Sequence, residues 1–202
     1  MPAAVPAIAG LVVGLLLGWE YGLVLLVCAV AVLLFFRDPR REPLGNQASI
    51  LSPADGRVVG IETLAKGHAL APEAVQRISI FMSPLDVHIN RAPVEGVVEA
   101  VSYNRGRFSA AYKGEASELN ESNALLIHAR AGFRVVVVQI AGWLARRIVC
   151  DVGVGAPLAR GDRFGLIMFG SRVDVYLPST VTVTAEHGQR VQAGRSVIAQ
   201  VP

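Results

Sequence analysis

The chain has 202 residues, 52% of them hydrophobic, and a formal net charge of +3. The length allows one domain of ordinary size with an additional segment. The mild basic excess suits an anionic surface but is too scattered to predict a nucleic-acid partner. The only two cysteines, Cys28 and Cys150, exclude a disulfide framework and fit a reducing compartment.

Residues 1–36 contain a run of about 30 apolar residues, interrupted only near Glu20. A bilayer core needs about 20 helical residues to be crossed. The run therefore predicts a membrane anchor, either one tilted span or a helical hairpin that bends near Glu20 and Gly22. Three glycines recur at every fourth position and favour a packed hairpin or a dimer, because they let another helix approach closely: Gly10, Gly14 and Gly18.

A basic linker, residues 37–49, follows the apolar run. Its arginines begin directly after the run, at Arg37, Arg40 and Arg41. By the positive-inside rule they keep the following domain on the cytoplasmic face of the cell membrane. A removable signal peptide fits less well, because the amino-terminal flank has no basic residue and the run is too long.

Residues 50–202 consist of short β-branched runs separated by Pro and Gly turns, with little helical periodicity. This pattern predicts a mainly β domain with a barrel-sandwich-like architecture. The runs are 56–62, 77–82, 96–103, 123–129, 133–142, 146–153, 164–169, 172–178 and 181–201. The last run resembles the hairpins of lipoyl and biotinyl carrier domains, but no hairpin tip carries the lysine that a carrier needs.

His88 is the histidine that we single out, because polar residues surround it directly after an apolar strand. In an extended chain Asp86, His88 and Asn90 point to one face. The other three histidines are interpreted as structural or solvated, with His68 in a solvated loop; they are His68, His128 and His187.

Metal and hydrolase motifs do not match this sequence. It has no H-E-x-x-H motif, no paired cysteines and no second histidine within ten residues of His88, so no metal site is predicted. Ser171 follows Gly170 and precedes a predicted strand, whereas a hydrolase nucleophile elbow leads into a helix. This leaves Ser171 with Asp55 and His88 as candidate partners.

Six segments, in order, resemble the short form of the phosphatidylserine decarboxylase family, whose members depend on a pyruvoyl group. The segments are 35–41, 52–59, 81–96, 120–123, 146–150 and 169–178, the last with the sequence FGSRVDVYLP. The ordered set covers most of the predicted β domain.

The resemblance implies a proenzyme that cuts itself between Gly170 and Ser171 into a β chain, 1–170, and an α chain, 171–202. Ser171 Oγ would attack the Gly170 carbonyl, and Ser171 would become a covalent pyruvoyl group. A Schiff base between this group and phosphatidylserine would then lose carbon dioxide, and phosphatidylethanolamine would be released. The implied partners are phosphatidylserine, membrane lipids and the two chains of a heterodimer, with a homo-oligomer left open.

By motif position, Asp55 matches the family's acid and His88 its first histidine. Longer members carry a second histidine three residues later, where this chain has Arg91. Either His88 takes both duties or another residue is the base in self-cleavage. Arg91 is a candidate contact for a substrate anion, with a solvated strand end as the alternative. The segment 120–123 receives no catalytic role, because it departs from the usual pattern at Ser122.

Two other functions remain open at this stage. One is a related pyruvoyl decarboxylase that acts on another amino-acid or acidic lipid headgroup. The other is a non-enzymatic, membrane-tethered adaptor in which Gly170 and Ser171 form an ordinary turn.

Overall fold

The computed structural model describes residues 8, 14, 18–106, 120–142, 147–168 and 171–202. The chain divides into two compact units, Met1–Pro39 and Arg40–Pro202. Within the described residues the first unit contains a helix, and every strand belongs to the second. The mainly β class predicted from the sequence is therefore confirmed.

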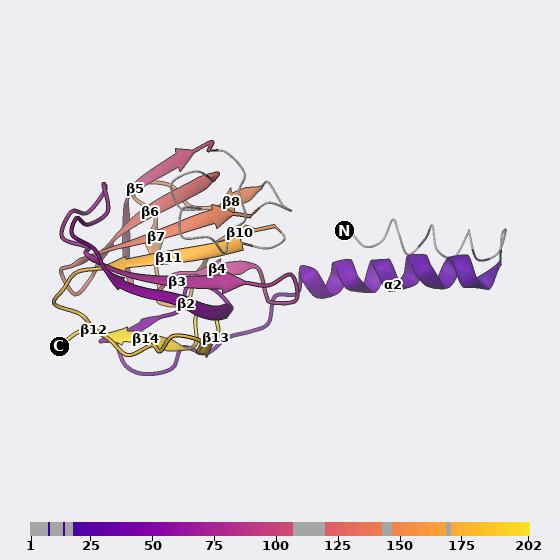
Figure 1. Cartoon of the computed structure of the whole chain (residues 1–202), viewed down its shortest axis with the longest axis horizontal. Helices are drawn as coiled ribbons and strands as arrows, with labels where there is room; N and C mark the ends of the chain where they lie inside the picture. The colour runs from indigo at the N-terminus through magenta and orange to yellow at the C-terminus, as the bar shows by residue number, and fades with distance from the viewer. Residues whose placement is uncertain (1–7, 9–13, 15–17, 107–119, 143–146, 169–170) are drawn as a thin grey trace. The chain divides into compact units, whose positions relative to one another are not determined.

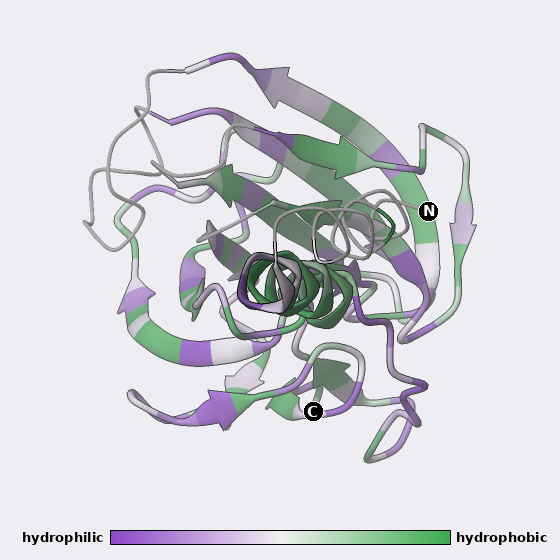
Figure 2. Cartoon of the chain, turned by 90° about the vertical axis from the view of Figure 1, so that its right-hand side faces the viewer, coloured by the Kyte–Doolittle hydropathy of each residue, from purple (hydrophilic) through white to green (hydrophobic). Residues whose placement is uncertain are grey.

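Helix α2 spans Trp19–Phe35 in the first unit. It begins after Gly18, whose φ of 124° is a conformation that favours glycine. Figure 2 shows hydrophobic residues on all sides of this helix, and most of its large apolar side chains are exposed. A Cβ built on Gly14 would lie 3.4 Å from the Cα of Gly22, so the backbone approaches closely at these two glycines.

In the described part of the chain, no helix is both long enough and apolar enough to cross a bilayer. Helix α2 has 17 residues. The membrane anchor predicted over residues 1–36 is therefore not supported here. Residues 1–7, 9–13 and 15–17 of that segment lie outside the described residues.

An antiparallel sheet of eight strands dominates the second unit, in the order β13-β2-β3-β11-β7-β6-β5-β9 (Figure 1). Figure 2 shows its strands curving around an interior, so the sheet is curled. The strands are β2 (Gly56–Thr63), β3 (Gln76–Met82), β5 (Gly96–Asn104), β6 (Ser122–Ala129), β7 (Arg134–Ala141), β9 (Pro157–Leu158), β11 (Ser171–Leu177) and β13 (Arg190–Val191).

Two sheets of three strands each complete the unit, in the orders β1-β14-β12 and β4-β10-β8. Their strands are β1 (Ser49–Leu51), β4 (Ile89–Arg91), β8 (Ile148–Cys150), β10 (Arg163–Ile167), β12 (Thr182–Val183) and β14 (Val197–Gln200). Ile198 and Ile167 from these sheets share one buried cluster with Ile78 of the main sheet. The small sheets thus pack against one face of the large sheet and close the core.

Strand β11 lies between β3 and β7 in the middle of the large sheet, and all seven of its residues are buried. Val173, Val175 and Leu177 point to the main core. Tyr176 points to the opposite face, where it packs in a second cluster with Ala71 and Ala74. A central strand covered on both faces is a rigid support for the residue at its start, Ser171.

Candidate active site

Three strand ends meet at Ser171. It is the first residue of β11 and pairs with Met82, the last residue of β3, and with Ala141, the last residue of β7. The Ser171 side chain is fully buried. Gly170, the other half of the predicted cut site, lies outside the described residues.

The hydroxyl of Ser171 donates a hydrogen bond to the thioether sulfur of Met82, with 3.3 Å between Oγ and Sδ. A thioether is a weak acceptor and does not take up a proton near neutral pH. The hydroxyl is therefore held in place but not activated by this contact. Activation of Ser171 requires the hydroxyl to turn toward a base.

Asp55 lies in the turn before β2 and is 8% exposed. Its Oδ2 accepts a hydrogen bond from Arg41 at 2.7 Å, and its Oδ1 accepts one from the Ala193 amide at 2.7 Å. The neighbouring Gly56 is required for packing, because a Cβ there would lie 2.1 Å from the Phe81 carbonyl oxygen. The Asp55 carboxylate thus joins three separate segments, which ordinary turn chemistry would not require.

Burial raises the pKa of Asp55 above its usual value. The Ala193 amide and the Arg41 guanidinium act in the opposite direction, but they do not outweigh the desolvation. A carboxyl with a raised pKa exchanges its proton closer to neutral pH. Asp55 therefore has the burial and electrostatics expected of an acid–base group.

His88 directly precedes β4 and is 2% exposed. Its Nδ1 lies 2.9 Å from the main-chain oxygen of Asp86. Because a carbonyl oxygen only accepts, this contact assigns a proton to Nδ1, so that Nε2 is the nitrogen with the lone pair whenever the ring is neutral. Asp86 itself lies in a turn closed by bonds with Ser83, so the prediction that its side chain shares a strand face with His88 is wrong.

The structure brings Asp55, His88 and Ser171 to one end of the large sheet. Asp55 stands before β2, two strands from Ser171, which corresponds to about 10 Å at the usual strand spacing. The main-chain oxygen of His88 accepts a bond of 3.2 Å from Ile167, four residues before Ser171. Each of the three side chains has a described hydrogen bond to another partner, and their joint role in self-cleavage stays a prediction.

Arg91, the predicted substrate contact, is 8% exposed and is not a solvated strand end. Its Nη1 donates to the Gly161 carbonyl at 3.1 Å, and its amide donates to the Pro53 carbonyl at 2.9 Å. A Cβ on Gly194 would lie only 2.7 Å from its Cδ. The Arg91 side chain is thus packed between two glycine turns.

Three buried carboxamides form a hydrogen-bonded chain that ends at the Met82 sulfur, the atom that Ser171 contacts. They are Asn123, Gln139 and Asn90. Asn123 Nδ2 donates to Gln139 Oε1 at 3.0 Å, and Gln139 Nε2 donates to Asn90 Oδ1 at 2.9 Å. Asn90 Nδ2 contacts the Met82 sulfur at 3.9 Å. Our sequence reasoning missed this chain, although its signal was a glutamine that interrupts the apolar run at 135–140.

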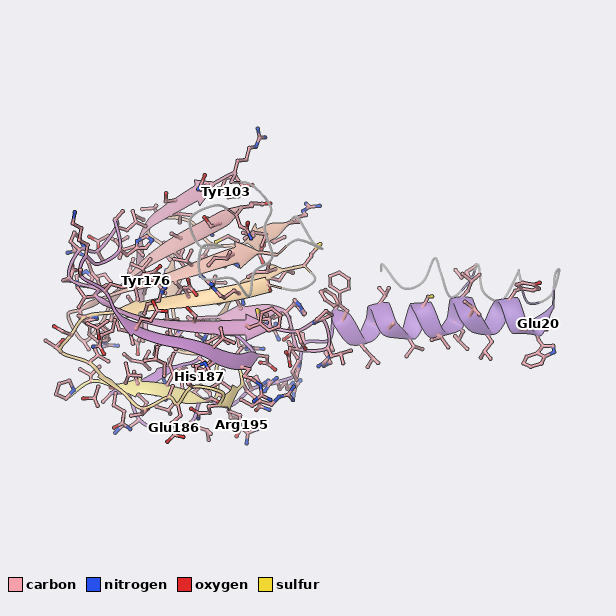
Figure 3. The ribbon with its side chains drawn as sticks, in the orientation of Figure 1. Glu20, Tyr103, Tyr176, Glu186, His187 and Arg195 are labelled. Atoms are coloured by element: carbon pink, nitrogen blue, oxygen red, sulfur yellow. The ribbon has the colours of Figure 1, made fainter. Side chains whose placement is uncertain are left out.

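The opposite face of β11 is charged. Arg172 and Asp174 form a buried ion pair with two contacts of 2.9 Å, and their side chains are 3% and 0% exposed. Tyr176 continues this face, and Figure 3 shows it within the sheet, with Tyr103 at the end of β5. The ring of His68 lies 4.8 Å from that of Tyr176, so the prediction of a solvated His68 is wrong.

A cavity of about 300 Å³ lies at the other end of the strands, lined by residues that include Glu95, Ala129 and Arg130. Ala129 ends β6, whereas Ser122 at its start belongs to the end that holds Ser171. Among the described residues, no three His, Cys, Asp or Glu side chains gather as metal ligands do.

The fold and the site define a mainly β protein whose central strand starts at a buried serine, at the sheet end that also holds a histidine and an aspartate. The sequence profile described as phosphatidylserine decarboxylase matches residues 29–199. This chain belongs to that family.

Relatives named phosphatidylserine decarboxylase proenzyme are similar along most of their length. The protein of Rhodococcus jostii (strain RHA1) is 48% identical over 88% of this chain and 76% of the relative. That of Cereibacter sphaeroides (strain ATCC 17025 / ATH 2.4.3) is 46% identical over 96% and 84%. That of Burkholderia mallei (strain SAVP1) is 42% identical over 98% and 91%.

Proposed function

We propose that this chain is a proenzyme that cleaves itself between Gly170 and Ser171 and then decarboxylates phosphatidylserine to phosphatidylethanolamine. The family and the names of its relatives support the reaction. The observation that carries the proposal is the placement of Ser171. In a chain of this family, a fully buried serine begins the central strand at the end that also holds His88 and Asp55.

Self-cleavage begins when Ser171 Oγ attacks the Gly170 carbonyl carbon and the peptide nitrogen leaves, which converts the amide into an ester. A base next removes the Cα proton of Ser171, and the ester leaves as the carboxylate of Gly170. Water then displaces ammonia, so that a keto group remains at the start of β11. The glycine at position 170 has no side chain to crowd the carbon that is attacked.

His88 is the proposed base for these proton transfers. Its tautomer, set by the Asp86 carbonyl, presents the Nε2 lone pair. Asp55 is the proposed acid, because it is buried at the same sheet end and its pKa is raised. Since its described bonds go to Arg41 and Ala193, Asp55 is proposed to act on the site through its charge.

Arg91 has a different proposed role from the one its sequence position indicated. Its guanidinium is bound to the Gly161 carbonyl and buried between turns. We assign it to holding β4, and therefore the neighbouring His88, against the rest of the unit.

The residues present fit a pyruvoyl group formed from Ser171. Pairing with Met82 and Ala141 on both sides holds position 171 after the bond to Gly170 is cut. The group supplies a keto function that accepts the electrons released when carbon dioxide leaves the substrate. The chain's own residues hold that position, bury it and bring His88 close to it.

We further propose that the α and β chains stay together after cleavage. The proposed α chain contributes β11, which lies between β3 and β7 of the β chain, and β14, which pairs with β1. Separation would break these ladders and expose the main core. The two chains should therefore remain one folded heterodimer.

The place of action in this proposal is the cytoplasmic face of the cell membrane. The substrate is a lipid, and helix α2 exposes apolar side chains on all sides, a surface suited to contact with acyl chains. Arg37 and Arg40 follow the helix, are exposed, and suit the anionic headgroups of the inner leaflet.

Intact mass and activity of the full-length chain test the function. The wild type should separate into residues 1–170 and 171–202 under denaturing conditions, with no free amine on the smaller piece. It should release carbon dioxide from vesicles that contain phosphatidylserine. Ser171→Ala should stay whole and inactive, with the circular dichroism of a folded β protein.

A folded wild-type chain that stays at full mass would rule out self-cleavage. Release of carbon dioxide by Ser171→Ala would show that another electron acceptor exists. A processed enzyme that acts on another headgroup and not on phosphatidylserine would retain the mechanism and overturn the substrate.

A further inference from the structure

We infer that Asn90 is a catalytic residue of self-cleavage, which donates a hydrogen bond to Oγ of Ser171 when this oxygen departs with Gly170. The inference rests on the proposed function, because it concerns the same self-cleavage. It assigns a role to a residue outside the three predicted from the sequence.

Two hydrogen-bond donors converge on one weak acceptor in this core. Ser171 Oγ lies 3.3 Å and Asn90 Nδ2 lies 3.9 Å from the sulfur of Met82. An oxygen that gains negative charge is a far better acceptor than a thioether. Asn90 is therefore placed to donate to Oγ as soon as charge develops on it.

The direction of the carboxamide chain determines which end of Asn90 faces the serine. The two ends of the Gln139 amide can be told apart, because one of them lies 3.4 Å from the Val149 carbonyl oxygen. That oxygen only accepts, so the end of Gln139 that faces it is the nitrogen, Nε2. The same nitrogen faces Asn90, whose facing atom must then be its oxygen. The NH₂ group of Asn90 is left to point toward the Met82 sulfur, which the Ser171 hydroxyl also contacts.

Burial makes this donor effective. Asn90 and Gln139 are fully buried, and Asn123 is 3% exposed. Each carboxamide polarises the next, and hydrogen bonds are stronger in a medium of low dielectric constant. A donor that is already oriented there stabilises developing charge without having to reorganise.

The elimination step is where this donor acts. In the ester, Oγ joins Cβ of Ser171 to the Gly170 carbonyl carbon. When the base removes the Cα proton, the electrons of the Cα–H bond form the Cα–Cβ double bond, and the Cβ–Oγ bond breaks with its pair on Oγ. Gly170 then leaves as a carboxylate whose new oxygen is Oγ. The Asn90 amide stabilises that leaving oxygen.

A purely structural role for the carboxamide chain predicts a different outcome. The three carboxamides come from β6, β7 and β4, and their hydrogen bonds link the large sheet to the small sheet that contains β4. Loss of that link would lower stability and slow every step together. Loss of a leaving-group donor would instead let the ester form and then accumulate.

The test follows maturation of the full-length chain after cell-free synthesis, with hydroxylamine added at set times. Hydroxylamine cuts the ester and leaves a fragment 171–202 that begins with an unmodified serine, whereas the matured fragment has lost the amine. Asn90→Leu should mature about a hundredfold more slowly, the usual cost of losing one donor to developing charge. Its chains should accumulate as the hydroxylamine-sensitive ester.

Two further variants separate chemistry from folding. Asn90→Asp keeps an acceptor for Gln139, so the link between the sheets remains. Its maturation rate, divided by that of wild type at the same pH, should be low at neutral pH and rise as the pH falls, because a protonated carboxyl again donates. Asn120→Ala is the matched control, since Asn120 is equally buried and donates to the Ala141 carbonyl at 2.9 Å. It should lower stability without accumulating ester.

Maturation of folded Asn90→Leu at the wild-type rate would overturn the inference, as would a block before the ester. Equal ester accumulation in Asn120→Ala would assign the effect to packing and overturn it too. If Asn90→Leu does not fold, Asn90→Asp provides the test. Recovery of its maturation relative to wild type at low pH supports the inference, and absence of recovery overturns it. Failure of the proposed function can be told apart from failure of this inference, because wild-type chains would then form neither ester nor fragments.

Discussion

The two faces of β11 bury polar groups of opposite character. The inner face presents neutral groups, the Ser171 hydroxyl beside the carboxamide of Asn90. The outer face presents a full ion pair, Arg172 with Asp174, only one residue away along the strand. Both faces exclude water, so the difference lies in charge and not in exposure.

This difference separates two requirements of the site. A nucleophile that must gain and lose charge benefits from neutral, oriented donors around it, because they respond to developing charge. A strand end that must stay in place after its covalent bond is cut benefits from strong fixed partners. Changes on the inner face should therefore affect reaction rates, and changes on the outer face should affect stability.

The largest effect after the loss of Ser171 itself is expected on the inner side, at His88. His88→Ala removes the proposed base and should slow the appearance of the two chains by about 10² to 10⁴-fold. Time courses on denaturing gels measure this rate. His128→Ala is the control, because His128 is exposed at the far end of β6. Equal rates for wild type and His88→Ala would remove His88 from the mechanism.

On the outer face, Asp174→Ala leaves the Arg172 guanidinium buried without its carboxylate and should reduce the free energy of unfolding by about 3–5 kcal/mol. Denaturant titration in the uncleaved Ser171→Ala background measures it. The double variant Arg172→Met with Asp174→Leu should recover most of the loss, because no unpaired charge remains. A double variant as unstable as the single one would contradict the assignment of the pair as an ionic anchor.

A smaller, pH-dependent effect is expected at His68, which covers Tyr176 on the outer face. Burial lowers the pKa of His68, although Asp174 acts against this. The unfolded chain therefore binds a proton near pH 6.5 that the folded chain takes up only at lower pH. Stability should fall as the pH drops from about 7 through the folded pKa, and His68→Gln should reduce this fall. Denaturant titrations at several pH values measure the free energy of unfolding of both proteins. If it depends on pH identically in wild type and His68→Gln, the prediction is refuted.

The smallest effect is expected at the other end of the strands. Arg130 pairs with Glu95 at 2.7 Å, but their side chains are 80% and 43% exposed. Solvent screens such a pair. Arg130→Ala should have the same unfolding midpoint and the same rate of self-cleavage as wild type, within measurement error. A clear loss of cleavage would show that this end is coupled to Ser171.

The long strands were predictable because their alternation or apolar runs extend over five or more residues, as in 77–82 and 133–142. The short strands β1, β4 and β9 were missed, because two or three residues carry no periodicity. At the site, Ser171 was recognisable from the ordered motifs that surround it. The partners of Asp55 were not, since Arg41 and Ala193 are distant in sequence and reach it only through folding.

By itself, the sequence determined the mainly β class, the family and the candidates Ser171, His88 and Asp55, because these depend on local pattern and motif order. Only the tertiary structure decided what each side chain contacts. It placed Ser171 against the Met82 thioether, packed Arg91 between glycine turns and linked three carboxamides that end at the same thioether. Such contacts join strands that are far apart in the chain, and their register and packing are set by the curled sheet as a whole.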